Sequence, residues 1–194
     1  MSLILASASA IRRHLLEQAG VAHEVEPARI DESPIKRSHD GNDEELALAL
    51  AEAKALEVSG RLSGNWVIGA DSVVSVNGRR FGKPGDREEA ARHLSAFSGN
   101  TIVLTSAVVI ARDGHIDWRL ADHANLQVRP LSERFIHNYL EMEWPAVAAC
   151  VGVFRMEGPG IQLFDRIDGD HFTILGMPLL PLLNALRERQ VLPS

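Results

Sequence analysis

Hydrophobic residues recur along the chain at two spacings, one typical of helices and the other typical of strands. The clearest helical stretch covers residues 43–59, where Leu46, Leu50 and Ala53 mark one face and Gly60 follows the end. Asp86 stands at an N-cap position, with Glu89 at the matching capping-box position. The further helices predicted by this spacing cover residues 11–19, 87–97 and 132–142 and a last segment after Pro178.

Apolar and β-branched runs predict the strands of the fold. These runs cover residues 3–6, 21–26, 66–76, 101–112, 115–128, 146–154 and 161–167. Asn77-Gly78 indicates a hairpin turn, and residues 29–42 are polar enough to predict a mobile loop. Because strands and helices mix without strict alternation, we expect an α/β fold around a mixed sheet, with residues 1–194 forming one domain.

Composition and charge narrow the class of protein. The 194 residues are 45% hydrophobic and 24% charged, which is ordinary for a globular chain. No apolar run approaches the roughly 20 residues of a membrane helix, and the start of the chain lacks a secretory signal, so a cytoplasmic protein without membrane contact is expected. Cys150 is the single cysteine, which excludes an intrachain disulfide. The net charge of −6 disfavours nucleic-acid binding.

The first strand-to-helix connection indicates an anion site. Ser9 stands where free backbone N–H groups open a helix, and Arg12 and Arg13 follow in its first turn. Cations are disfavoured at a helix N-terminus unless an anion reverses the local charge, so we expect both arginines to serve a phosphate. The alternative is that Ser9 only caps the helix and that the arginines are solvated or paired with Glu17.

Two further positions are candidates for chemistry. Asp71 follows the apolar run 66–70 and is expected at the end of a strand, where α/β proteins place their ligands. Lys54 flanks the apolar face of the helix 43–59 and could point into a cleft towards phosphate. The plainer alternatives are a turn aspartate and a lysine whose stem runs along apolar surface towards water.

Lysine is rare in this chain, which uses arginine freely. The lysines are Lys36, Lys54 and Lys83, and the last of these lies in the loop Gly82-Lys83-Pro84-Gly85. A compact ammonium binds its partners differently from a planar guanidinium, so each retained lysine is a candidate for a specific role. The plainer alternative is a biased genome composition.

These segments resemble, in order and spacing, the motifs of the Maf family. The matching motifs are Ser-Ala-Ser-Ala-Ile-Arg-Arg, Ile-Asp-Glu, Ala-Glu-Ala-Lys-Ala, Gly-Ala-Asp and Gly-Lys-Pro, followed by Ser98-Gly99-Asn100, Ile167-Asp168-Gly169-Asp170 and Gly176-Met177-Pro178-Leu179. The resemblance covers essentially the whole chain. It implies an inosine-triphosphatase-like α/β fold with two lobes around a central cleft, a divalent metal cofactor, Mg²⁺ or Mn²⁺, and a homodimer.

The resemblance also implies a reaction and its residues. Water would attack the α-phosphorus of a nucleoside triphosphate and expel pyrophosphate. The implied catalytic residues are Asp71, Lys54 and Lys83, the implied metal ligands are Glu32 and Asp71, and the implied phosphate-binding residues are Ser9 and Arg12. The charges of these residues suit these roles. The lysines and the arginine offset the negative charge of a triphosphate, and the carboxylate oxygens are ligands for a hard divalent metal.

Three positions bear on the choice of base. Ile11 and Ser72 differ from the arginine and threonine of the branch of the family that acts on dTTP and UTP. Glu157 matches the glutamate of the branch that resembles 7-methylguanosine triphosphatase. Ile11 and Ser72 differ from the tryptophan and the glutamine of that branch. We expect a purine or modified nucleotide as substrate, the alternative for Glu157 being a solvent-facing turn residue.

Two other functions stay open beside the pyrophosphatase. One is a nucleotide-binding regulator of cell division or septation without significant turnover, which has less need of metal ligands. The other is a phosphatase that releases orthophosphate. The identity of the phosphorus product separates all three.

Overall fold

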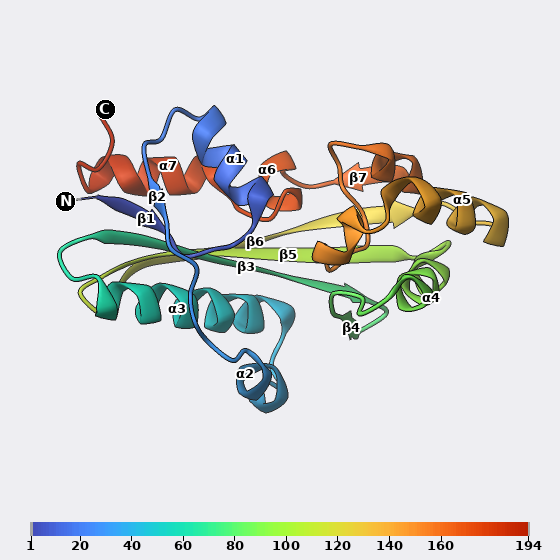
Figure 1. Cartoon of the computed structure of the whole chain (residues 1–194), viewed down its shortest axis with the longest axis horizontal. Coiled ribbons are helices and arrows are strands. Elements are labelled where there is room, and N and C mark those ends of the chain that lie inside the picture. Colours follow the sequence, from blue (N-terminus) through green and yellow to red (C-terminus); the bar gives the residue numbers. More distant parts are fainter. Residues whose placement is uncertain (1, 194) are drawn as a thin grey trace. The chain divides into compact units, whose positions relative to one another are not determined.

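A mixed sheet with helices on its faces forms the framework of the chain in a computed structural model, which describes residues 2–193 (Figure 1). The strands are β1 (Leu3–Leu5), β2 (Glu24–Val25), β3 (Trp66–Val76), β4 (Arg79–Phe81), β5 (Thr101–Arg112), β6 (His115–Val128) and β7 (Phe164–Asp168). The α-helices are α1 (Ala10–Gln18), α2 (Ser33–Ser38), α3 (Asp43–Arg61), α4 (Arg87–Phe97), α5 (Glu133–Glu143), α6 (His171–Ile174) and α7 (Leu179–Glu188). Two short 3₁₀ helices are η1 (Ala146–Ala149) and η2 (Pro159–Leu163).

The strand order confirms the predicted mixed α/β sheet. The order is β2-β1-β3-β5-β6-β7, with β4 paired to β3 beside this path. β1 is parallel to β2 and to β3, with Leu3 opposite Trp66 and Leu5 opposite Ile68. β4 is antiparallel to β3, and β7 is antiparallel to β6.

The chain divides into two compact units, and β3, β5 and β6 each contribute residues to both. Unit 1 comprises Met1–Ser72, Thr105–Asp122 and Asp170–Ser194. Unit 2 comprises Val73–Leu104 and His123–Gly169. The expectation of one domain with two lobes around a cleft stays a prediction.

Unit 1 places helices on both faces of its strands. α1 and α7 lie on one face and α3 on the other (Figure 1). The first face holds a buried core that includes Leu5, Leu16, Ile68 and Leu182. Alternate residues of β3 point to opposite faces, so Ile68 and Ala70 join this core while Gly69 faces α3.

Unit 2 confirms two helix starts that the sequence predicted. The Asp86 side chain accepts a hydrogen bond from the backbone N–H of Glu89 at 2.7 Å and so caps α4. The Ser132 hydroxyl accepts from Phe135 N at 3.2 Å and caps α5. The hairpin at Asn77-Gly78 is also confirmed, since both residues have positive φ, as a tight two-residue turn requires.

Four sequence predictions were wrong, wholly or in part. The polar loop 29–42 contains α2, which has Pro34 in its first turn, where a missing N–H costs nothing. Residues 146–154 form η1 and turns, because Val153 has a φ of 55°, which no strand allows. In the predicted strands 161–167 and 21–26, only the residues from Phe164 onward and Glu24–Val25 are paired.

Within residues 2–193, no helix is both long and apolar enough to cross a membrane.

Candidate active site

A close approach of α3 to β3 sets the position of the candidate site. A side chain at Gly69 would place its Cβ 2.2 Å from the Ala51 carbonyl oxygen and 2.8 Å from the Ala55 Cβ, so only glycine fits there. Small residues on both elements therefore let the helix backbone lie directly on the strand. Lys54 and Asp71 lie next to this contact. Lys54 is on α3, and Asp71 follows Gly69 by two residues on β3.

The Lys54 ammonium lies between two carboxylates. It forms an ion pair with Asp71 Oδ2 and a second with Glu32 Oε1 at 2.7 Å. The side chains of Lys54 and Asp71 are only 15% and 13% exposed, so the lysine does not extend towards water and Asp71 is not a turn residue. The sequence had predicted Asp71 at the end of a strand, and this was wrong. Asp71 lies inside β3, because the strand continues to Val76 to pair with β4.

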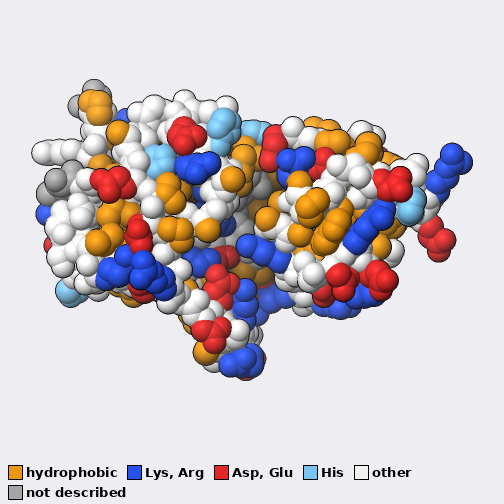
Figure 2. Space-filling model, viewed as in Figure 1, with side chains coloured by type: hydrophobic (Ala, Val, Ile, Leu, Met, Phe, Trp, Pro, Cys, Tyr) orange, Lys and Arg blue, Asp and Glu red, His pale blue; other side chains and the backbone are white. Residues whose placement is uncertain are grey.

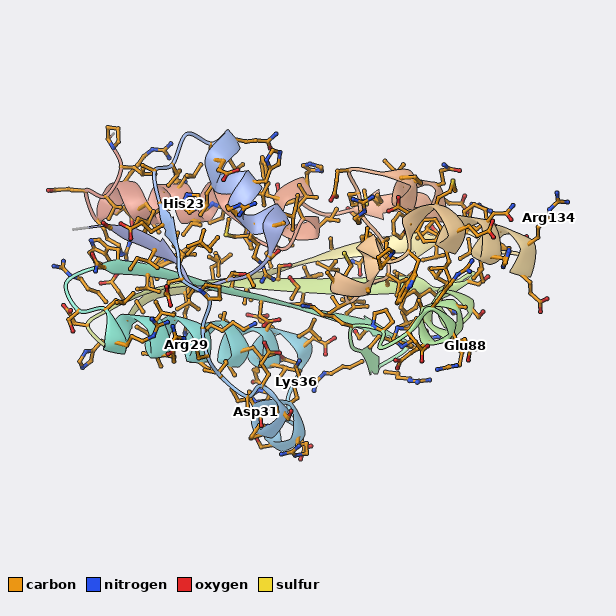
Figure 3. The ribbon with its side chains drawn as sticks, viewed as in Figure 1. His23, Arg29, Asp31, Lys36, Glu88 and Arg134 are labelled. Atoms are coloured by element: carbon orange, nitrogen blue, oxygen red, sulfur yellow. The ribbon has the colours of Figure 1, made fainter. Side chains whose placement is uncertain are left out.

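Glu32 is the third member of this group, and it lies at the N-cap position of α2. Its Oε2 atom pairs with Lys36 at 2.6 Å, while its Oε1 atom faces Lys54. Partial burial acts to raise the pKa of Glu32, but hydrogen bonds and charge from Lys36 and Lys54 outweigh it and lower this pKa to about 2. Figure 3 labels Asp31, which directly precedes Glu32, and Lys36, which lies on α2.

Arg12 is held in place by four hydrogen bonds to unit 1. Its Nε donates to the Gly176 carbonyl at 2.8 Å, and Nη1 donates to the Ala70 carbonyl at 3.0 Å and to Ser7 Oγ at 3.3 Å. Nη2 donates to Ser72 Oγ at 3.0 Å, which leaves one of the five guanidinium N–H groups for a ligand. Burial lowers the pKa of Arg12, while the charges of Asp71 and Glu32 act in the opposite direction.

A directional chain of hydroxyls continues from Arg12. Ser106 Oγ donates to the Thr173 carbonyl at 2.8 Å, which uses its single proton. Ser72 Oγ, 2.9 Å away, must therefore donate to Ser106 while it accepts from Arg12. The sequence predicted that Ser72 bears on the choice of base. In the structure its hydroxyl holds Arg12, and its backbone N–H donates to Asp71 Oδ1 at 2.6 Å.

The N-terminus of α1 keeps backbone donors free. Ser9 occupies the N-cap position, but its side chain makes no capping hydrogen bond, and the first turn contains no acidic residue. The simple N-cap alternative for Ser9 therefore does not apply. Arg13 is exposed and lies 3.5 Å from Glu17, as its plainer alternative predicted, and Ile11 is half-buried on the same helix.

The donor set fits a metal that is shared with a bound phosphate. Glu32 and Asp71 already converge on one cation, the Lys54 ammonium. Among residues 2–193, no cluster of three or more His, Cys, Asp or Glu side chains could hold a metal by itself. Mg²⁺ is commonly bound through one or two carboxylates together with substrate phosphates, which matches this pair of ligands.

Lys83 and Glu157 belong to unit 2. Both are exposed, Lys83 between β4 and α4 and Glu157 in the turn before η2. Burial raises the pKa of the Cys150 thiol, and the charge of Glu157 adds to this effect while that of Lys83 opposes it. The two predicted site residues of this unit therefore lie near the same thiol.

Several residues of the site were given no individual role by the sequence analysis. Ser7 and Ser106 are buried hydroxyls, and Gly176 contributes only a carbonyl oxygen. Ser106 follows Thr105 within an otherwise apolar run, and this pair of hydroxyls was the one available signal. On the face seen in Figure 2, basic side chains are interspersed with acidic ones and form no continuous stripe.

Known proteins similar to this chain point to one family. Residues 2–189 match the family described as Maf-like protein. A protein of Rhizobium etli named 7-methyl-GTP pyrophosphatase is 46% identical over 190 residues, which cover 96% of this chain and 95% of that protein. A Nitrobacter winogradskyi protein named nucleoside triphosphate pyrophosphatase is 47% identical over 191 residues, 98% of this chain and 95% of that one. Among solved structures, the nucleoside-triphosphatase or dITP/XTP pyrophosphatase of Mycobacterium abscessus covers 66% of this chain and 73% of its own, at 19% identity and a TM-score of 0.40.

Proposed function

The chain belongs to the Maf family, and from this premise we propose that it hydrolyses a nucleoside triphosphate to the monophosphate and pyrophosphate. The observation that carries the proposal is the pair of carboxylates, Glu32 and Asp71, that meets on Lys54 beside the Arg12 guanidinium. A triphosphate brings about four negative charges, and this part of unit 1 combines cations with two oxygen ligands for a metal.

Each residue of unit 1 has a separate role in this proposal. Asp71 accepts a hydrogen bond from the attacking water and orients it towards the α-phosphorus. The water oxygen bonds to that phosphorus as the bond from the phosphorus to the oxygen bridging the α- and β-phosphates breaks. The water gives up a proton to the Asp71 carboxylate, and pyrophosphate leaves. Lys54 balances the charge that develops, and Arg12 offers its remaining N–H to a phosphate oxygen. Ser9 extends the phosphate site at the free N–H groups of α1, and Arg13 adds a cation there on leaving its exposed pair with Glu17.

Glu32 and Asp71 would hold Mg²⁺ or Mn²⁺ together with the phosphates. When bound, the metal supplies Lewis acidity and offsets phosphate charge. For this to occur, Lys54 must give up at least one of its two carboxylate partners. The ammonium then becomes available to the phosphates. The same lysine therefore pairs with the carboxylates before the metal and the triphosphate bind, and with the phosphates afterwards.

The substrate we favour is a purine or modified nucleotide such as 7-methyl-GTP. The names of the relatives support this, and so does Glu157, whose carboxylate can accept from a guanine edge or favour a positively charged base. Lys83, on unit 2 with Glu157, adds a cation for the phosphates, and Ile11 offers an apolar contact. We further propose that the protein acts as a homodimer.

The test is a nucleotide panel with the full chain, Mg²⁺ or Mn²⁺ and separate detection of pyrophosphate and orthophosphate. The panel contains 7-methyl-GTP, GTP, inosine triphosphate, dTTP and UTP. Pyrophosphate with an equal amount of monophosphate is expected for a subset. Orthophosphate as the first product would indicate a phosphatase, and tight binding without any product would indicate a nucleotide-binding regulator.

A further inference from the structure

Two side chains of α5 hold the segment that leads to Glu157. The Tyr139 hydroxyl donates to the Val153 carbonyl at 3.0 Å. One turn along the helix, the Glu143 carboxylate accepts two hydrogen bonds from Arg155, at 2.8 Å from Nε and 3.0 Å from Nη2. The Glu143 side chain is only 4% exposed and the Arg155 side chain 35%, so a buried carboxylate holds a partly exposed guanidinium in bidentate geometry.

The backbone between these contacts is fixed in an uncommon conformation. Val153 is fully buried and has a φ of 55°, which a β-branched residue adopts only when its surroundings enforce it. At Gly152, a Cβ would fall 2.3 Å from the Phe154 ring. The segment is therefore held in one shape, and strain of this kind tends to cluster at functional sites.

Arg155 has a second carboxylate within its electrostatic reach. The pKa of Arg155 is raised first by its hydrogen bond to Glu143, against the effect of burial, and then by the charges of Glu143 and Glu157. Glu157 is exposed, and in the described part of the chain it forms no hydrogen bond or ion pair. The guanidinium is thus committed to Glu143, although Glu157 is only two residues away.

We propose that Glu143 is a positioning residue for nucleotide selection, which binds Arg155 and so keeps the Glu157 carboxylate unpaired for a cationic or N–H-bearing base. The inference rests on the proposed function, in which Glu157 contacts the base. Without Glu143, Arg155 turns to Glu157 and neutralises it. A positively charged base then loses the partner that distinguishes it from a neutral base.

The test compares 7-methyl-GTP with GTP, which differ in the charge and methylation of one ring. The measured quantity is the ratio of their kcat/KM values at fixed metal, with a melting temperature for every variant. Glu157→Gln sets the reference and should lower the ratio by about tenfold or more, the scale of one hydrogen bond to a charged group. Glu143→Gln should lower it in the same direction, because Arg155 is then free to mask Glu157.

Removing Arg155 separates positioning from folding. Arg155→Gln should keep the ratio near that of the wild type, and adding it to Glu143→Gln should restore the ratio, since no guanidinium remains to mask Glu157. A purely structural ion pair predicts the opposite pattern, with equal losses for both single variants and no recovery in the double variant. Asp117→Asn, which breaks an ion pair with Arg189 in unit 1, controls for destabilisation and should leave the ratio unchanged.

The inference and the proposed function fail separately. If the wild-type chain releases no pyrophosphate, the ratio of dissociation constants for the same two nucleotides, measured by calorimetry, decides the role of Glu143. If Glu143→Gln does not fold, Glu143→Asp replaces it, with a smaller drop expected. An unchanged ratio in either Glu143 variant, or in Glu157→Gln, overturns the inference.

Discussion

Replacing Lys54 by methionine tests whether one cation holds the two carboxylates together. Methionine keeps the length and apolar stem of the side chain but leaves Glu32 and Asp71 without their shared ammonium. Removing one partner of a largely buried ion pair costs about 3–5 kcal/mol. Glu32 is 30% exposed and keeps Lys36, so we expect the lower end, about 3 kcal/mol.

This loss should be visible as a fall in melting temperature that a divalent metal reverses. For a chain of this length, about 2–4 °C accompanies each kcal/mol, which predicts a fall of about 6–12 °C in EDTA. A metal at 100 times its dissociation constant stabilises by about 2.7 kcal/mol, enough to recover most of the fall. The wild-type chain should gain less from the same metal, because Lys54 already occupies the position between the carboxylates.

Differential scanning fluorimetry in EDTA and across a Mg²⁺ or Mn²⁺ series measures both effects without reference to turnover. Lys36→Met is the matched control, since Lys36 pairs with Glu32 alone and is 54% exposed. Such an exposed pair contributes at most about 1 kcal/mol, so its melting temperature should change little. If Lys54→Met melts like the wild type in EDTA, or gains no more from metal than the wild type does, the shared-cation reasoning is refuted.

Three further predictions concern the same group of residues. Asp71→Asn should reduce pyrophosphate release by about 10²–10⁴-fold with the fold intact, and near-normal rates at an unchanged melting temperature would remove Asp71 from the mechanism. Ser106→Ala should cost about 1–3 kcal/mol and raise KM more than it lowers kcat, because Ser72 loses its acceptor and Arg12 its alignment; an effect on kcat alone would contradict the hydroxyl chain. The pKa of Glu32 is about 2 in the folded chain against 4.5 ordinarily, so the stability that its ion pairs contribute is present above pH 4.5 and is lost as the pH falls towards 2. In acid denaturation with EDTA, Glu32→Gln should therefore make the free energy of unfolding fall less steeply over this pH range. A fall as steep as that of the wild type would count against the ion pairs.

Local signals explain which parts of the fold the sequence could predict. The starts of α4 and α5 are encoded by Asp86 and Ser132, whose capping hydrogen bonds form within three residues. η1 has no such signal, because the shape of its segment depends on a hydrogen bond from Tyr139, 14 residues before Val153. α2 has only six residues, and the Glu32–Lys36 pair that supports its first turn resembles ordinary loop charge in the sequence.

The same distinction holds within the candidate site. Asp71 and Lys54 stand out because charged residues beside apolar runs are unusual, and the structure brings them together. Ser106 and the Gly176 carbonyl gave little or no signal, since their partners are 34 and 164 residues away. Ser72 was predicted to matter, but its contact with Arg12 appears only when β3 and α1 are packed.

The choice between lysine and arginine follows from how many partners each position must hold at once. Arg12 fixes two carbonyls and two hydroxyls, which only a planar fork with five donors can do, and a lysine there would leave at least one of them without a donor. Lys54 meets two carboxylates with a compact charge, and a divalent metal can bind the same two carboxylates with a greater charge and shorter contacts. An arginine at position 54 would hold both carboxylates in a rigid bidentate geometry and resist that exchange. The arginine therefore shapes the site, and the lysine can exchange its partners, as the proposed metal-dependent reaction of a triphosphate requires.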